Sequence, residues 1–98
     1  MTAYVLSLVT VTDPERFQEY AKRALPLIEK SGGRVLARGA NQKLLEGEDL
    51  PTRIVVIEFP SVEKAVAHYR SPAYLAAKKF REGAGSIHMM VVEAVPKA

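Results

Sequence analysis

A chain of 98 residues, of which 48% are hydrophobic, is long enough for one globular domain but hardly for two. Its 14 basic and 11 acidic residues give a net charge of +3 without forming a basic block, which argues against nucleic acid as a partner. The absence of cysteine excludes a disulfide framework, a thiolate nucleophile and a cysteine-based zinc site. We expect a single domain over residues 1–98, in which residues 95–98 form a short tail.

The apolar stretch from Ala3 to Val11 is predicted to form the first strand. It has no basic leader, and Asp13-Pro14-Glu15 follows it in place of a small-residue cleavage site, so the pattern is not that of a signal peptide. No apolar run in the sequence reaches the roughly 20 residues that a membrane-spanning helix needs. We therefore expect a cytoplasmic protein that has no membrane partner.

The first helix is predicted to begin at Pro14, because Asp13 can cap it and proline suits the first helical position. Pro26 is expected to kink this helix or to end its regular part, and Gly32-Gly33 to stop it. The apolar stripe at helical spacing consists of Phe17, Tyr20, Ala21, Ala24 and Ile28.

A short second strand is predicted from Arg34 to Arg38, with Gly39 as a bend or bulge. A polar hairpin connection follows, in which residues 43–46 are a candidate continuation of the strand and residues 47–51 form the turn. Glu46 and Arg53 are expected to form an ion pair across this hairpin.

The stretch from Arg53 to Ser61 is predicted to form the central strand and the cap of the next helix. The run Ile54-Val55-Val56-Ile57 is branched at Cβ throughout, which suits a pleated strand better than a helix. Alternation places Val55, Ile57 and Phe59 on one face and Ile54, Val56 and Glu58 on the other. Because both faces are mostly apolar, we expect this strand to be covered on both sides.

Two short helices and a last strand complete the predicted elements. Ser61 and Ser71 are the expected caps of the helices, and Gly83 to Gly85 ends the second one. The predicted apolar positions are Val62, Ala65, Val66 and Tyr69 in the first helix and Ala73, Ala77 and Phe80 in the second. Ile87 to Ala94 is the last strand, and it is again apolar on both faces.

This order of elements predicts an α+β, ferredoxin-like (βαββαβ) domain with an antiparallel sheet and helices on one face. Three of the strands carry apolar residues on both faces, so the face without helices would be a large exposed apolar patch. A second copy of the chain, packed sheet to sheet, would cover that patch. We therefore expect a homodimer formed through the sheet face.

Several segments of the chain are similar to a known family. They are Val11-Thr12-Asp13-Pro14 with Tyr20, Gly32-Gly33-Arg34, Arg38-Gly39, Leu45-Glu46-Gly47, residues 53–61, and Tyr69-Arg70-Ser71-Pro72-Ala73-Tyr74. As a set they resemble the uncharacterised family called domain of unknown function 1330, within the dimeric α+β barrel superfamily. The family pattern has an acidic residue where this chain has Ala73. The resemblance implies a ferredoxin-like fold and a dimer, and it implies no particular reaction.

The candidate site residues are polar side chains set in otherwise apolar strands, namely Glu58, Arg38 and His88. Tyr20, Tyr69 and Tyr74 are candidate contributors of hydroxyl groups to a ligand pocket beside them. The alternative interpretation is a structural ion pair with core tyrosines. We expect Glu58 to be buried and paired with Arg38 or His88, with a small cleft beside the pair.

No metal or cofactor is expected. His68 and His88 are the only histidines, and their spacing is not that of a metal site, so we interpret His68 as a helix-surface residue and His88 as a strand-packing residue.

The sequence leaves three functions open. The chain could be a cofactor-free enzyme acting on a small organic molecule in a cleft between sheet and helices, a non-catalytic binder of such a molecule, or a structural dimerisation module without a ligand. The residues alone do not choose among them, because no catalytic motif is present.

Overall fold

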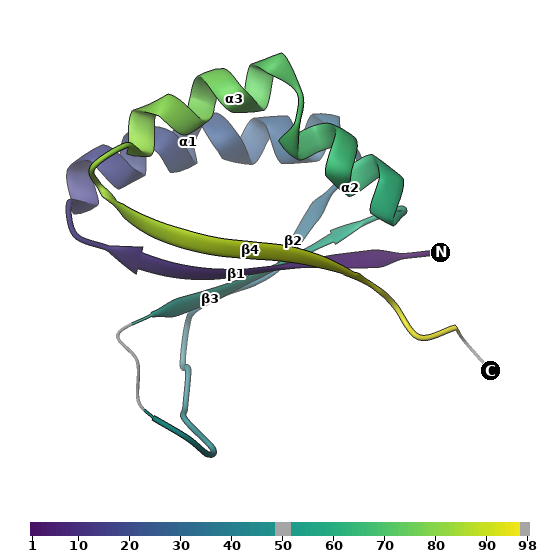
Figure 1. Ribbon diagram of the computed structural model, residues 1–98, viewed down its shortest axis with the longest axis horizontal. Helices are drawn as coiled ribbons and strands as arrows, with labels where there is room; N and C mark the ends of the chain where they lie inside the picture. Colours follow the sequence, from purple (N-terminus) through teal and green to yellow (C-terminus); the bar gives the residue numbers. More distant parts are fainter. Residues whose placement is uncertain (49–51, 97–98) are drawn as a thin grey trace.

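The computed structural model describes residues 1–48 and 52–96, which form a four-stranded sheet covered on one face by helices (Figure 1). The strands are β1 (Ala3–Val11), β2 (Arg34–Arg38), β3 (Arg53–Phe59) and β4 (Gly85–Glu93). The helices are α1 (Pro14–Lys30), α2 (Val62–Tyr69) and α3 (Pro72–Lys78), followed by the 3₁₀ turn η1 (Lys79–Arg81). The strand order is β2-β3-β1-β4 and every pairing is antiparallel, which confirms the ferredoxin-like α+β fold.

The helices begin where their capping residues predict. Asp13 accepts a hydrogen bond from the Arg16 amide at 3.2 Å, and Ser61 accepts one from the Lys64 amide at 3.1 Å. Ser71 accepts one from the Tyr74 amide at 3.2 Å. These side chains satisfy amides that the first turn of a helix leaves unpaired, so the local sequence fixes where each helix starts.

The two faces of the sheet have different surroundings. The inner face, toward the helices, buries Ala3, Val5, Ser7 and Val9 of β1 together with Ile57 and Phe59 of β3. The outer face carries Ile54, Met90 and Val92, which are 39%, 56% and 50% exposed. The outer face is therefore apolar and uncovered in a single chain, as the strand pattern predicts.

One irregularity in the pairing of β2 with β3 reverses the direction of a side chain. Arg34 lies opposite Glu58 and Val35 opposite Ile57, but Ala37 then lies opposite Val56 and Arg38 opposite Val55. Leu36 is the extra residue of a β-bulge. The sequence placed the bend or bulge at Gly39, which does form a bend just after the strand, with φ of +71°.

Other expectations need correction. Pro26 does not end α1, which continues to Lys30, and residues 43–46 do not extend β2 as a strand. In α3 the buried residues are Tyr74 and Ala77, whereas Phe80 is 42% exposed and lies under the Arg23 guanidinium. The predicted turn at residues 47–51 and the predicted tail at residues 95–98 lie partly outside the described residues.

Within the part of the chain that the structure describes, no helix has the length and apolar character needed to cross a membrane.

Candidate functional site

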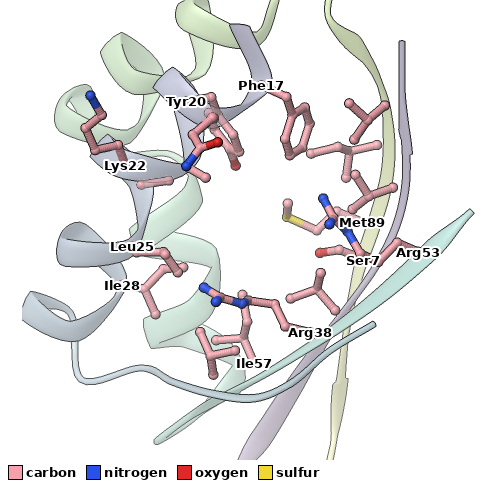
Figure 2. A pocket seen from close by; sticks show the side chains of 18 of the residues that line it. Ser7, Phe17, Tyr20, Lys22, Leu25, Ile28, Arg38, Arg53, Ile57 and Met89 are labelled. Carbon is pink, nitrogen blue, oxygen red and sulfur yellow. The ribbon is translucent and has the colours of Figure 1, made fainter. Parts of the chain in front are cut away.

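A cavity of about 1020 Å³ lies between α1 and the inner face of the sheet (Figure 2). On the α1 side, Ala21 and Ala24 separate the larger Phe17, Tyr20 and Ile28. On the sheet side the lining includes Ser7, Val9, Val55, Ile57, Ile87 and Met89. The helix side of the cavity thus combines two small alanines with larger side chains, and the sheet side is mostly branched and apolar.

Two arginines reach into this cavity from neighbouring strands. Alternation along β3 places Arg53 on the same face as Val55, and Arg53 lies opposite Val9 of β1. The bulge at Leu36 brings Arg38 opposite Val55, so it joins Arg53 on the inner face. Figure 2 shows both guanidinium groups directed into the cavity.

The chain around Arg53 is held in place by two contacts. The Gln42 side chain donates to the Thr52 carbonyl at 2.8 Å and accepts from the Ile54 amide at 3.0 Å. Gly39 lies against the Arg53 side chain, where a Cβ atom would overlap Cγ of the arginine. Both contacts fix the path of β3 at the residue that supplies the guanidinium.

Among the residues that the structure describes, no carboxylate balances the charges at the cavity. Among residues 1–48 and 52–96, no aspartate or glutamate lines the cavity, and neither Arg38 nor Arg53 forms an ion pair. The predicted ion pair between Glu46 and Arg53 does not form. The site is therefore electropositive and can attract an anion.

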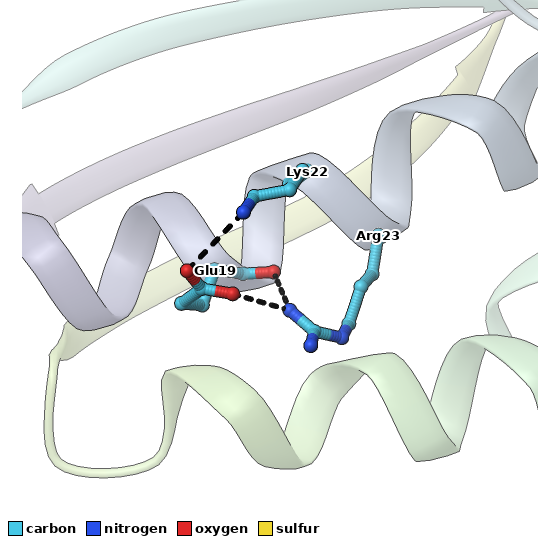
Figure 3. A network of polar contacts seen from close by, with 3 residues as sticks. All are labelled: Glu19, Lys22 and Arg23. Carbon is cyan, nitrogen blue, oxygen red and sulfur yellow. Dashed lines mark hydrogen bonds and ion pairs between the residues drawn. The ribbon is translucent and has the colours of Figure 1, made fainter.

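Lys22, at the rim, is a different case. Its amine points away from the cavity (Figure 2) and lies 3.3 Å from Glu19, which also binds Arg23 at 2.7 Å (Figure 3). These hydrogen bonds, first from Arg23 and then from Lys22, lower the pKa of the exposed Glu19 carboxyl. Lys22 is thus engaged on the helix surface.

The three candidate tyrosines form one cluster. The Tyr20 and Tyr74 hydroxyls are 2.9 Å apart, and the ring of Tyr69 packs edge-on against Tyr74 with centroids 4.8 Å apart. Tyr20 and Tyr69 line the cavity, whereas Tyr74 does not. The buried Tyr69 hydroxyl has no hydrogen-bond partner among the described residues.

Burial is the main cause that raises the pKa of both Tyr20 and Tyr69, and the neighbouring Tyr74 adds to it. Both side chains therefore keep their protons at neutral pH and can act as hydrogen-bond donors.

Glu58 and His88 lie on the outer face, away from the cavity. Glu58 pairs with Arg34 at 3.4 Å, so the prediction that Arg38 or His88 would be its partner is wrong. The sheet register explains this result: Glu58 lies opposite Tyr4, whereas His88 lies opposite Leu8, four residues farther along β1. That separation is about 13 Å along a strand.

The prediction that His68 is a surface residue is wrong, because the side chain is only 3% exposed. Its Nδ1 atom lies 2.8 Å from the Ser31 hydroxyl, and its ring packs among Phe59, Tyr69 and Tyr74. Nε2 is buried without a partner among the described residues, and burial lowers the pKa of the ring. The part of the chain that the structure describes contains no group of three side chains suited to a metal ion.

Solved structures with the same fold include proteins of unknown function and an oxygenase. A protein of unknown function from Rhodopseudomonas palustris has a TM-score of 0.80 at 24% identity, over 98% of this chain and 84% of that one. SnoaB, a cofactor-independent oxygenase from Streptomyces nogalater, has a TM-score of 0.67 at 14% identity, over 98% and 95% of the chains. A dimeric protein of unknown function and ferredoxin-like fold from Bacteroides fragilis has a TM-score of 0.64 at 18% identity, over 95% and 96%. At these identities the likeness shows the fold alone.

No curated protein matches the chain significantly. The model of a family described as a domain of unknown function, DUF1330, matches residues 2–95, which is nearly the whole chain. The resemblance seen in the sequence segments is thereby confirmed, and the chain belongs to the DUF1330 family.

Proposed function

We propose that this chain binds a small organic molecule in the cavity between α1 and the sheet. The observation that carries the proposal is the cavity itself, whose volume of about 1020 Å³ is far larger than a packing defect. Sites for drug-sized ligands typically measure roughly 300–1,000 Å³ and have apolar walls with a few convergent polar groups. The apolar walls here, with Arg38, Arg53 and Tyr20 directed inward, match that description.

The lining favours binding over acid–base catalysis. Its polar side chains are arginines, a lysine, hydroxyl groups and amides, and no histidine or carboxylate of the described residues reaches it. General-base catalysis needs a group that can accept a proton near neutral pH, and arginines and protonated tyrosines do not. A cofactor-free enzyme is therefore the second candidate. SnoaB, which has the same fold, is described as an enzyme of that kind. Turnover of a substrate would distinguish such an enzyme from a binding protein.

The direct test measures binding of a neutral fluorescent probe, N-phenyl-1-naphthylamine, to the purified protein. We expect saturable fluorescence enhancement that is lost when Ala24, which faces the cavity, is replaced by Trp. The matched control is Ala76→Trp, because Ala76 is exposed on α3 and does not line the cavity. Equal binding by the wild type and both variants would contradict a ligand site in the cavity.

We further propose that two copies of the chain associate through the outer face of the sheet. The uncovered apolar side chains of β3 and β4 support this arrangement, because soluble monomers rarely expose such a patch. The Bacteroides protein of the same fold is described as dimeric. A module that only dimerises would need this face and no cavity, so probe binding and association can be tested separately.

A further inference from the structure

We infer that the ligand of the cavity is an organic anion with an apolar body, whose carboxylate or similar oxyanion is bound by Arg38 and Arg53. This inference rests on the proposed binding function and adds the chemical class of the ligand. The charge distribution, the backbone irregularity and the supporting contacts each contribute to it.

The bulge at Leu36 is the first observation. In a regular strand, Arg38 would point to the same face as Arg34, which is the outer face. The extra residue turns Arg38 to the inner face instead, next to Val55. Bulges are over-represented beside functional sites, where they redirect a side chain, and this one directs a permanent positive charge into an apolar cavity.

The second observation is that this charge is repeated and that no described residue neutralises it. Arg53 joins Arg38 on the same face, and the described part of the chain places no carboxylate in the lining. Guanidinium groups stay charged at any physiological pH, so the cavity presents two positive charges, both of them also exposed to solvent. An anion in the cavity would accept charge-assisted hydrogen bonds from them.

The third observation is that the fold supports Arg53 specifically. Gln42 binds the backbone on both sides of it, through the Thr52 carbonyl and the Ile54 amide. Gly39 provides the space through which the aliphatic part of the arginine passes. These contacts hold the arginine against the hairpin, although Arg53 itself remains exposed to solvent.

The remaining lining defines the rest of the ligand. Ser7 is 3% exposed and lies in the same row of the sheet as Met89, Val55 and Arg38, so a hydroxyl is available near the arginines. Beyond it the walls are apolar as far as Tyr20, which lies across the cavity from Arg38 (Figure 2). A carboxylate, sulfonate or phosphate ester on an apolar body would fit these surroundings.

The test compares two probes that share one apolar body. 8-Anilinonaphthalene-1-sulfonate carries a sulfonate, and N-phenyl-1-naphthylamine lacks it. We expect the sulfonate probe to bind at least about tenfold more tightly, and Arg38→Gln and Arg53→Gln each to weaken it roughly tenfold to a hundredfold. The neutral probe should bind these variants as it binds the wild type.

Arg34→Gln is the matched control, because Arg34 is on the same strand as Arg38 but on the outer face, and the net charge changes equally. It should leave both probes unaffected. Ala24→Trp and, should that variant not fold, Ala21→Trp show whether the signal comes from the cavity.

The outcomes separate the two proposals. If the neutral probe binds in the cavity and the sulfonate gives no advantage, or if neither glutamine variant weakens the sulfonate probe, the anion inference is overturned and the binding function stands. If filling the cavity displaces neither probe, both proposals are overturned.

Discussion

Arg34 and Glu58 form a cross-strand ion pair on the outer face of the sheet, with 3.4 Å between Nη2 of the arginine and Oε1 of the carboxylate. The side chains are 72% and 32% exposed, so water solvates much of the pair. Exposed pairs of this kind stabilise proteins by about 0–1 kcal/mol. The expected buried carboxylate is thus replaced by a surface pair at the end of β3.

We therefore predict that Glu58→Ala lowers the free energy of unfolding by no more than about 1 kcal/mol, because the arginine left behind is already hydrated. Urea denaturation of this variant, of Arg34→Ala and of the double variant measures the coupling between the two side chains. A loss of about 3 kcal/mol or more would contradict the exposed pair, because only breaking a buried pair costs that much.

The fold followed from local patterns that tertiary structure did not override. β-Branched runs predicted the strands, and Asp13, Ser61 and Ser71 predicted the helix starts. The antiparallel sheet with helices on one face then followed from the order of elements and short connections. These features depend on neighbouring residues in the chain, so a single sequence contains them.

The site depended on registers that the sequence does not display. In Arg34-Val35-Leu36-Ala37-Arg38, plain alternation puts both arginines on one face, and no residue type marks Leu36 as the bulge. Two other site residues could have been found from the sequence. Arg53 alternates with Val55 and Ile57 and so lies on their face of the strand, and His68 lies three residues after the buried Ala65, on the same side of the helix. The sequence showed which strand residues are polar. Only the register of strand pairing determined which of these side chains lie next to each other.

The caps at Asp13 and Ser71 lead to a second prediction. Replacing either by Ala should lower the free energy of unfolding by about 0.5–2 kcal/mol, because a first-turn amide loses its acceptor. Ser71 should lie toward the upper end, since its hydroxyl also donates to the His68 carbonyl at 2.7 Å. Chemical denaturation measures both effects. Unchanged midpoints for both variants would show that these hydrogen bonds do not stabilise the helices.

The buried His68 predicts a loss of stability in mild acid. Burial lowers its pKa in the folded protein, so below about pH 6.5 the unfolded chain binds a proton that the folded chain does not. The contribution of the neutral His68 side chain to the free energy of unfolding should be fully present above that pH. It should decrease as the pH falls toward the lowered pKa of the folded state.

Denaturation midpoints between pH 7.5 and 5 measure this dependence. His68→Phe should flatten the decline, and His88→Phe, on the outer face of the sheet and away from His68, is the control that should retain it. An unchanged decline in His68→Phe would assign the acid sensitivity to other groups.

The proposed dimer predicts different results for two adjacent valines. Val56 lies on the outer face, whereas Val55 packs against the buried core. Val56→Asp should dissociate the dimer and leave the chain folded, while Val55→Asp, whose carboxylate would face the cavity beside Arg38, should leave the dimer associated. Light scattering should give about twice the chain mass of 10.8 kDa for the wild type. A wild-type monomer at micromolar concentration would refute the association.

Gly39 offers a test of how the backbone positions Arg53. Its φ of +71° and the nearby Arg53 side chain both disfavour any Cβ atom. Gly47 also has a positive φ, +98°, but no described residue lies within 4 Å of its Cβ position. Gly39→Ala and Gly47→Ala should therefore both incur backbone strain, roughly 1–2 kcal/mol where the backbone cannot adjust, whereas only Gly39→Ala should displace the arginine.

Binding of 8-anilinonaphthalene-1-sulfonate distinguishes these two effects. The affinity should fall in Gly39→Ala to the level of Arg53→Gln and stay at the wild-type level in Gly47→Ala, since the latter leaves the guanidinium in place. Combining Gly39→Ala with Arg53→Gln should cause no further loss, because both changes remove the same contact. If Gly47→Ala weakened binding of the probe as much as Gly39→Ala, the conformation of the hairpin would control binding, and not the path of the Arg53 side chain. If neither variant weakened binding, the close approach of Gly39 and Arg53 would have no part in anion binding.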